Sequence, residues 1–144
     1  MLSADPGPAG LAPGAEGLID PRRVFHRLPG GSREELLEEL AARLAEDGVV
    51  SDPGELSARL IDRERLGCTG LGGGVAIPHC KLRHIQGVVV AVASTAVPVD
   101  FGAADGIPID LVFLVASPAD APAAHLQALA RVSRLLRTPG VVEG

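Results

Sequence analysis

The chain has 144 residues, a hydrophobic fraction of 47%, an aromatic fraction of 2% and a formal net charge of -5. Its length suits a single domain with a substantial core. The acidic balance and the lack of Trp and Tyr argue against nucleic-acid binding, which uses basic patches with interleaved aromatic side chains. No apolar run approaches the length of a membrane span, so we expect no membrane insertion.

The N-terminal segment indicates where the domain begins, and the two cysteines indicate the compartment in which it works. Met1 to Gly17 is dominated by Pro, Gly and Ala and is predicted to be disordered. It lacks the cationic and apolar regions of a secretory signal. The cysteines form no CxxC motif, so neither a disulfide framework nor a zinc site is expected. We therefore expect one domain over residues 18–144 in a reducing cytoplasm.

The first predicted elements are an edge strand and a helix. Val24 to Leu28 alternates in polarity, which places His26 near the exposed face, where we interpret it as structural or neutral. After a turn, Ser32 starts a capping box in which Glu35 is expected to reach back to Ser32. Leucines at helical spacing then predict an amphipathic helix from Arg33 to Glu46.

A second helix and two buried strands are expected next. Asp52 is predicted to cap the helix, with Pro53 at its first position and its end near Glu64. Two apolar runs, Val88 to Ala93 and Ile109 to Ala116, are short enough to be buried strands.

A last helix completes the predicted order. Asp120 is expected to cap it, and it should run from about Ala121 to Arg137. Two helices, then several strands, then a helix predict an α/β fold of one domain, in which a small mixed β-sheet is flanked by helices.

The glycine-rich segment from Gly67 to His79 is the most informative part of the sequence. We predict a glycine loop, a short buried strand over Val75 to Ile77, and a rigid link through Pro78. His79 would then stand at a strand end beside an unshielded loop, where another protein can reach its imidazole. A nucleotide-binding P-loop is excluded because no Lys-Ser or Lys-Thr pair follows the last glycine.

His125 and Arg63 are two further candidates. His125 lies on the inward side of the last predicted helix, in its first turn, where the positive helix N-terminus disfavours an imidazolium ion. On the residues alone, a core histidine with one hydrogen bond is an equal alternative. Arg63 at a helix end is by itself most often a solvated charge, and Arg65 lies nearby.

Three stretches together resemble a known family: Arg63-Glu64, Thr69-Gly70 and the run from Gly74 to His79. They are similar, without gaps, to the phosphorylation-site segment of the fructose/mannitol/nitrogen-type enzyme IIA domains of the bacterial phosphoenolpyruvate phosphotransferase system. The stretch from His125 to Ala130 is similar to the family's histidine segment whose imidazole faces the phosphorylated histidine. The resemblance covers about residues 18–142.

The resemblance implies a phosphocarrier with a mixed sheet flanked by helices. His79 would accept a phosphoryl group on Nε2 from a phosphorylated HPr-type protein. His125 would donate a hydrogen bond to the phosphoryl oxygens, and Arg63 would neutralise their charge, with Arg65 as the second candidate. The residues present require no metal ion and no cofactor.

The step after loading is left open by the sequence. In one version a IIB domain takes the phosphoryl group on to a sugar, and in the other the phosphorylation state of a stand-alone IIA controls partner proteins. The stretch His79-Cys80-Lys81-Leu82 is more similar to the nitrogen-regulatory branch, which we favour. A third alternative is an interaction module on the same fold that never carries phosphate.

Some features depart from the family pattern or need a separate interpretation. Gly73 stands where the family commonly carries Asn, which removes a side-chain hydrogen bond near the site. The chain ends at residues 141–144, where the family continues into another short helix, so we expect a shortened C-terminus or a less covered edge of the fold. Cys68 and Cys80 are interpreted as packing residues, with a redox-sensitive Cys80 as the alternative. His84 is expected to face solvent.

Overall fold

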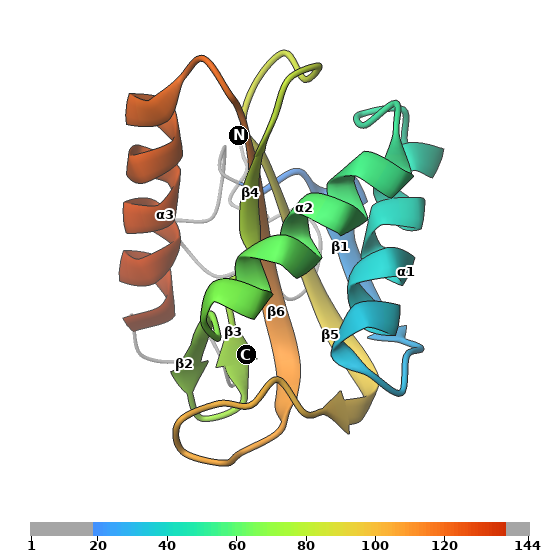
Figure 1. Ribbon diagram of the computed structural model, residues 1–144, viewed down its shortest axis with the longest axis vertical. Helices are drawn as coiled ribbons and strands as arrows, with labels where there is room; N and C mark the ends of the chain where they lie inside the picture. Colours follow the sequence, from blue (N-terminus) through green and yellow to red (C-terminus); the bar gives the residue numbers. More distant parts are fainter. Residues whose placement is uncertain (1–18, 138–144) are drawn as a thin grey trace, which may run out of the picture.

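The computed structural model of the chain describes residues 19–137 (Figure 1). The predictions for residues 1–17 and 141–144 fall outside the described residues. In chain order the elements are η1 (Pro21–Arg23), β1 (Val24–Leu28), α1 (Arg33–Glu46), α2 (Pro53–Leu66), β2 (Gly70–Gly72), β3 (Val75–Ala76), β4 (His79–Leu82), β5 (Val89–Val99), β6 (Ile109–Pro118) and α3 (Pro122–Arg137).

The strands of the described residues form one mixed sheet in the order β1-β5-β6-β3-β2, and β4 also pairs with β6. β5 and β6 are antiparallel, β1 is parallel to β5, and both β3 and β4 are parallel to β6. β6 is therefore the central strand, with β5 along one edge and the β3–β4 segment along the other. The predicted mixed sheet is confirmed.

Helices cover both faces of the sheet, with α1 and α2 on one side and α3 on the other (Figure 1). Side chains of β6 alternate between the two layers, as the pleat of a strand requires. Val112 and Leu114 belong to the core under α1 and α2, whereas Phe113 and Val115 belong to the core under α3. This is the predicted α/β arrangement of one domain.

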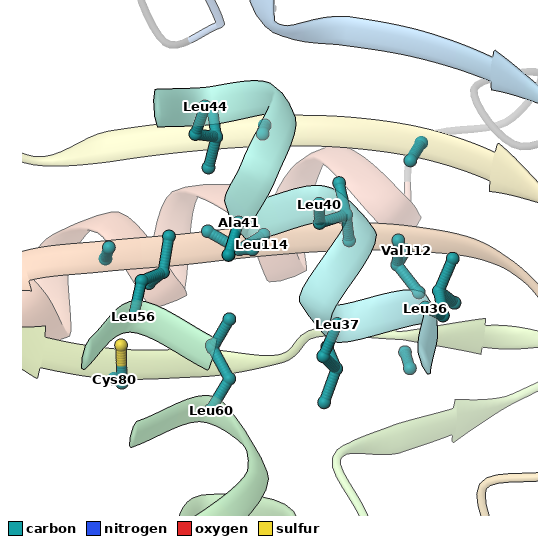
Figure 2. Packing of buried hydrophobic residues seen from close by; sticks show 14 of the residues in the cluster. Leu36, Leu37, Leu40, Ala41, Leu44, Leu56, Leu60, Cys80, Val112 and Leu114 are labelled. Atoms are coloured by element: carbon teal, nitrogen blue, oxygen red, sulfur yellow. The ribbon is translucent and has the colours of Figure 1, made fainter. Parts of the chain in front are cut away.

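Leucine is the most frequent residue in the layer under α1 and α2, part of which is shown in Figure 2. Leucines at helical spacing turn one stripe of each helix toward the sheet. Burying one such side chain contributes about 1.5–3 kcal/mol to folding. The fully buried leucines of the two helices are Leu36, Leu37, Leu40, Leu44, Leu56 and Leu60.

Helices α1 and α2 begin at their predicted caps. The Ser32 hydroxyl accepts from the Glu35 amide at 3.1 Å, but the Glu35 carboxylate accepts from the Gly31 amide, one residue before the expected partner. Asp52 accepts from the Glu55 amide at 3.0 Å. α2 continues to Leu66, past the end predicted at Glu64.

The glycine-rich segment is more regular than its sequence suggests. Gly70–Gly72 was expected as a loop but forms β2, which pairs antiparallel with β3. β3 ends at Ala76, and His79 begins β4 instead of following a single strand. Pro78 has no N–H for the ladder, but its carbonyl oxygen accepts from the Val115 amide at 2.9 Å. Pairing with β6 then resumes at His79, opposite Val115.

Three other boundaries differ from the predictions. β5 continues to Val99, because that residue pairs with Ile109 beyond a register shift. β6 continues to Pro118, because its last residues pair with β4. α3 begins at Pro122, so Asp120 lies in the turn before the helix and not next to its first residue.

β1 lies at an edge of the sheet, and His26 is exposed on it, as predicted. Among residues 19–137, no helix combines the length and the apolar character needed to cross a bilayer.

Candidate active site

His79 is half-buried at the start of β4, next to the proline that interrupts the sheet. Its Nδ1 lies 2.8 Å from the carbonyl oxygen of Ile77. A carbonyl oxygen can only accept a hydrogen bond, so we assign the ring proton to Nδ1 and the lone pair to Nε2. The backbone thus presents the ring with Nε2 as the nucleophilic atom.

Arg63 lies in the last turn of α2 and contacts that same nitrogen. Its Nε–H donates to Nε2 of His79 over 3.3 Å, and its Nη1 donates to the carbonyl oxygen of Gly67 at 2.9 Å. The second bond ties the guanidinium to the end of its own helix. A planar guanidinium matches the oxygens of a phosphoryl group. Arg63 therefore holds a cation next to Nε2 of His79.

His125 comes from α3, on the other face of the sheet, and its ring lies beside that of His79. The two ring centroids are 5.7 Å apart and the planes are tilted by 45°. His125 is buried in the first turn of α3, as expected. Burial, followed by the charges of His79 and Lys81, lowers the pKa of His125 from its usual value of 6.5. The neutral ring is therefore favoured, with burial as the largest cause and not the helix N-terminus that the sequence suggested.

The remaining candidates stay outside this cluster. Arg65 is well exposed and its guanidinium lies 3.8 Å from Asp62, so it pairs along its own helix. His84 is exposed, as expected. Burial raises the pKa of the Cys80 thiol to about 12, which disfavours the reactive thiolate and favours the packing interpretation. The Cys68 sulfur accepts from the Gly70 amide at 3.2 Å.

Glu64 and Thr69 belong to the stretches that resemble the family, but the sequence assigned them no role in the site. Glu64 is 2% exposed, and its carboxylate accepts hydrogen bonds from both the amide and the hydroxyl of Thr69. The Thr69 carbonyl oxygen accepts from the Ile77 amide at 3.1 Å. Because the Ile77 carbonyl holds Nδ1 of His79, Glu64 lies at the start of a hydrogen-bonded chain that ends at the imidazole. The sequence did contain a signal for the burial of Glu64, because Leu56, Leu60 and Glu64 follow one another at a spacing of four on one stripe of α2.

Ser117 was not predicted to belong to the site. It is fully buried near the end of β6, and its Oγ lies 2.7 Å from Nδ1 of His125. The signal was weak, since Ser117 is a small polar residue directly after the apolar run predicted as a strand. Among the described residues, no group of three or more His, Cys, Asp or Glu side chains is arranged to hold a metal ion.

The carboxylates of two aspartates lie near the tip of the β2–β3 hairpin. Asp105 accepts from the Gly73 amide at 2.9 Å. Gly74 has a φ of +86°, and a Cβ there would lie 2.9 Å from a carboxylate oxygen of Asp110. Gly73 has a φ of +66° and nothing within 4 Å of such a Cβ. The space around position 73 would therefore admit an Asn side chain.

Exposed leucines stand on α2 and α3, which carry Arg63 and His125, and on β2, which pairs with β3. Leu66 at the end of α2, Leu71 on β2 and Leu126 on α3 have exposed fractions of 85%, 54% and 67%. Leu71 also lines a cavity of about 410 Å³ together with Leu136 of α3. Exposed apolar side chains contribute to protein interfaces where they gather into a patch.

Comparison with known proteins gives consistent matches along the chain. The family model described as phosphoenolpyruvate-dependent sugar phosphotransferase system, EIIA 2, matches residues 17–144. A nitrogen regulatory protein from Pseudomonas aeruginosa is 39% identical over 121 residues, covering 84% of this chain and 79% of its own length. A nitrogen regulatory protein from Bradyrhizobium diazoefficiens is 40% identical over 126 residues, covering 88% of this chain and 82% of its own length.

Solved structures agree with the sequence matches. The crystal structure of nitrogen regulatory protein IIA-Ntr from Neisseria meningitidis has a TM-score of 0.78 and 30% identity, covering 88% of this chain and 86% of that one. The crystal structure of IIA mannitol from Escherichia coli has a TM-score of 0.67 and 25% identity, covering 87% of both chains.

The six-stranded mixed sheet, with helices on both faces, is thus the fold of the IIA-Ntr and IIA mannitol structures, which places the protein among enzyme IIA phosphotransfer proteins. The chain belongs to the EIIA type-2 family of the phosphoenolpyruvate-dependent sugar phosphotransferase system, and it is similar to that family's nitrogen regulatory proteins.

Proposed function

We propose that this protein is a phosphocarrier of the nitrogen-regulatory type, in which Nε2 of His79 accepts a phosphoryl group from the phosphohistidine of an HPr-type protein. One observation carries the proposal: the two nitrogens of the His79 ring have opposite partners. Nδ1 faces the Ile77 carbonyl oxygen at 2.8 Å, and Nε2 faces the Arg63 Nε–H at 3.3 Å. The nitrogen that must attack is the unprotonated one, and it lies beside the cation.

The transfer needs little beyond positioning and charge stabilisation. The Nε2 lone pair of His79 attacks phosphorus, and the phosphorus–nitrogen bond of the donor breaks with its electron pair returning to the donor's ring. His79 keeps its Nδ1 proton, and the Ile77 carbonyl oxygen stabilises the positive charge that the ring gains. Arg63 releases Nε2 as the phosphoryl group arrives, and its guanidinium then binds the phosphoryl oxygens.

His125 completes the site from the opposite face of the sheet. Its ring, 5.7 Å from that of His79 between centroids, is close enough to reach a group attached to Nε2. A phosphoryl group on histidine carries about two negative charges near neutral pH. A neutral imidazole donates a hydrogen bond to it without placing a full charge in a buried position, and the lowered pKa of His125 favours that state.

The regulatory branch is favoured for the onward step because the matched relatives include nitrogen regulatory proteins. Transfer to a IIB domain in sugar uptake is the second candidate. A structure with the same fold is a complex of the E. coli mannitol IIA with phosphorylated IIB, at 23% identity and a TM-score of 0.71. A non-catalytic interaction module is the third, and the convergence of His79, Arg63 and His125 argues against it.

The test is incubation of the chain with phosphoenolpyruvate, enzyme I and an HPr-type protein, followed by peptide mapping of acid-labile phosphate. We expect label on His79 alone and none in His79→Ala, which should fold normally. Label on His26, His84 or His125 in that variant would refute the assignment. The absence of label in the unmodified chain would favour the interaction module, and phosphosugar formed on adding a IIB protein and its sugar would favour transport.

A further inference from the structure

The two histidines of the site are held by different kinds of partner. His79 has its Nδ1 against a backbone carbonyl oxygen, whereas Nδ1 of His125 lies 2.7 Å from the hydroxyl oxygen of Ser117. A carbonyl oxygen dictates which nitrogen is protonated, but a hydroxyl can donate or accept. The tautomer of His125 therefore depends on whether the Ser117 hydroxyl donates a hydrogen bond to Nδ1 or accepts one from it.

The position of Ser117 is a consequence of the pleat of β6. Phe113 and Val115 face the core under α3, and Ser117 is the next residue on that face at the strand's period of two. Pairing of Ser117 with Lys81 on β4 fixes its place along the sheet. The side chain is fully buried, and His125, at 6% exposure, lies against it from the first turn of α3.

The two arrangements differ in whether the Ser117 hydroxyl hydrogen has an acceptor. Among the described residues, Nδ1 of His125 is the polar atom within hydrogen-bond distance of the Ser117 hydroxyl. If Nδ1–H donated to Ser117, the hydroxyl hydrogen would be left in the interior without an acceptor. If Ser117 donates to Nδ1, no hydrogen of this pair is left unpaired at the contact. Buried donors are rarely unpaired in folded proteins, so the second arrangement is favoured.

We infer that Ser117 is a positioning residue that donates its hydroxyl hydrogen to Nδ1 of His125 and holds that ring in the tautomer protonated on Nε2. The inference rests on the proposed function, since the Nε2–H is then available to the phosphoryl oxygens on His79. In the opposite tautomer a lone pair on Nε2 would face those oxygens and repel them. The pair thus has opposite tautomers: the nucleophile His79 is protonated on Nδ1, and the donor His125 on Nε2.

The direct test is nitrogen NMR of the imidazole rings in the intact, unphosphorylated protein above pH 7. We expect a protonated Nε2 and an unprotonated, hydrogen-bonded Nδ1 for His125. In Ser117→Ala the Nδ1 resonance should lose its hydrogen-bond shift, and a fraction of the other tautomer should be detectable. A protonated Nδ1 on His125 in the unmodified protein would overturn the inference, whatever the protein's activity.

The kinetic test uses loading of His79 from a phosphorylated HPr-type protein. Ser117→Ala should slow loading about tenfold, as expected for the loss of one hydrogen bond. Thr95→Val is the matched control, because Thr95 is a buried β5 residue whose hydroxyl has no hydrogen-bond partner within the described residues. Loading in this control should be unchanged. Equal slowing in both variants would indicate a general packing effect and would refute the role of Ser117.

A double variant shows whether Ser117 acts through His125. In a His125→Ala background, the further change Ser117→Ala should leave the loading rate unaltered, because the ring that it positions is gone. A further tenfold loss there would contradict the inference. If the unmodified chain accepts no phosphate at all, the proposed function fails, and the NMR measurement still decides the assignment of Ser117.

Discussion

The carboxylate of Glu64 accepts the backbone amide of Thr69 at 3.1 Å and also its hydroxyl, inside the protein at the end of α2. Thr69 in turn accepts from the amide of Ile77, whose carbonyl oxygen holds Nδ1 of His79. One side chain on a helix thus anchors the backbone that orients the imidazole on β4.

Glu64→Ala should lower the free energy of unfolding by about 2–4 kcal/mol, because it leaves two buried donors of Thr69 without an acceptor. Glu64→Gln is the matched variant. Its amide oxygen can accept from the Thr69 amide, but its NH₂ group leaves the Thr69 hydroxyl hydrogen without an acceptor. We therefore expect a loss of stability that is smaller than in Glu64→Ala. Urea unfolding measures both variants. Equal stability of the Ala and Gln variants would show that these hydrogen bonds contribute little.

Leu71→Asp should slow loading of His79 severely without changing thermal stability. Leu71 is 54% exposed on β2, so a carboxylate there stays solvated in the free protein, but it would be desolvated in a complex with the donor. Val97→Asp is the matched control, because Val97 is an exposed apolar residue on β5. Stopped-flow loading measures both variants. Unaltered kinetics in Leu71→Asp would place the docking surface elsewhere.

His125→Ala should allow His79 to accept phosphate, but much more slowly, and should also impair onward transfer. Removing one preorganised donor to a developing charge typically costs about 2–4 kcal/mol of transition-state stabilisation. Single-turnover loading gives the rate, and circular dichroism checks that the fold is retained. A rate equal to that of the unmodified protein would remove His125 from the site.

The lowered pKa of His125 also predicts a pH dependence of stability. Between the folded pKa and the usual value of 6.5, the unfolded chain binds a proton at this position that the folded protein does not. The stability that depends on a neutral His125 is therefore fully present above pH 6.5, and it is lost as the pH falls from 6.5 toward the pKa of His125 in the folded protein. Urea unfolding from pH 5 to 8 should show a steeper acid loss in the unmodified protein than in His125→Gln. Parallel curves of stability against pH in the two proteins would contradict the assignment of this acid loss to His125.

The two neighbouring glycines of the hairpin should respond differently to substitution. Gly74→Ala should destabilise the protein by about 1–3 kcal/mol, because its positive φ strains any side chain and its Cβ would approach the Asp110 carboxylate to 2.9 Å. Gly73→Asn should change stability by less than about 1 kcal/mol, since Asn tolerates left-handed backbone and the surrounding space is open. Thermal unfolding measures the stability of both variants. An equal loss of stability in the two would show that the space around the hairpin tip does not determine the effect of a substitution.

Much of the fold was predictable because its determinants are local. The Ser32 and Asp52 caps and the leucine spacing of α1 act within a few residues, so the first two helices begin where the sequence places them. The candidate site residues were also found from sequence, by the resemblance of the segment ending at His79 and of the segment that starts at His125. The structure brings both histidines and Arg63 together.

What only the tertiary structure decided depends on partners that are distant along the chain. Gly70–Gly72 is a strand because β3 lies beside it, and His79 begins a strand because β6 continues past Pro78. The same holds for the missed side chains. By local criteria a serine after an apolar run is an ordinary surface residue, and a glutamate on the leucine stripe of a helix is predicted to be buried but without any indication of its partner. Their burial against Thr69 and His125, set by the order of the strands and the packing of α3, gives these two groups a part in positioning the imidazoles.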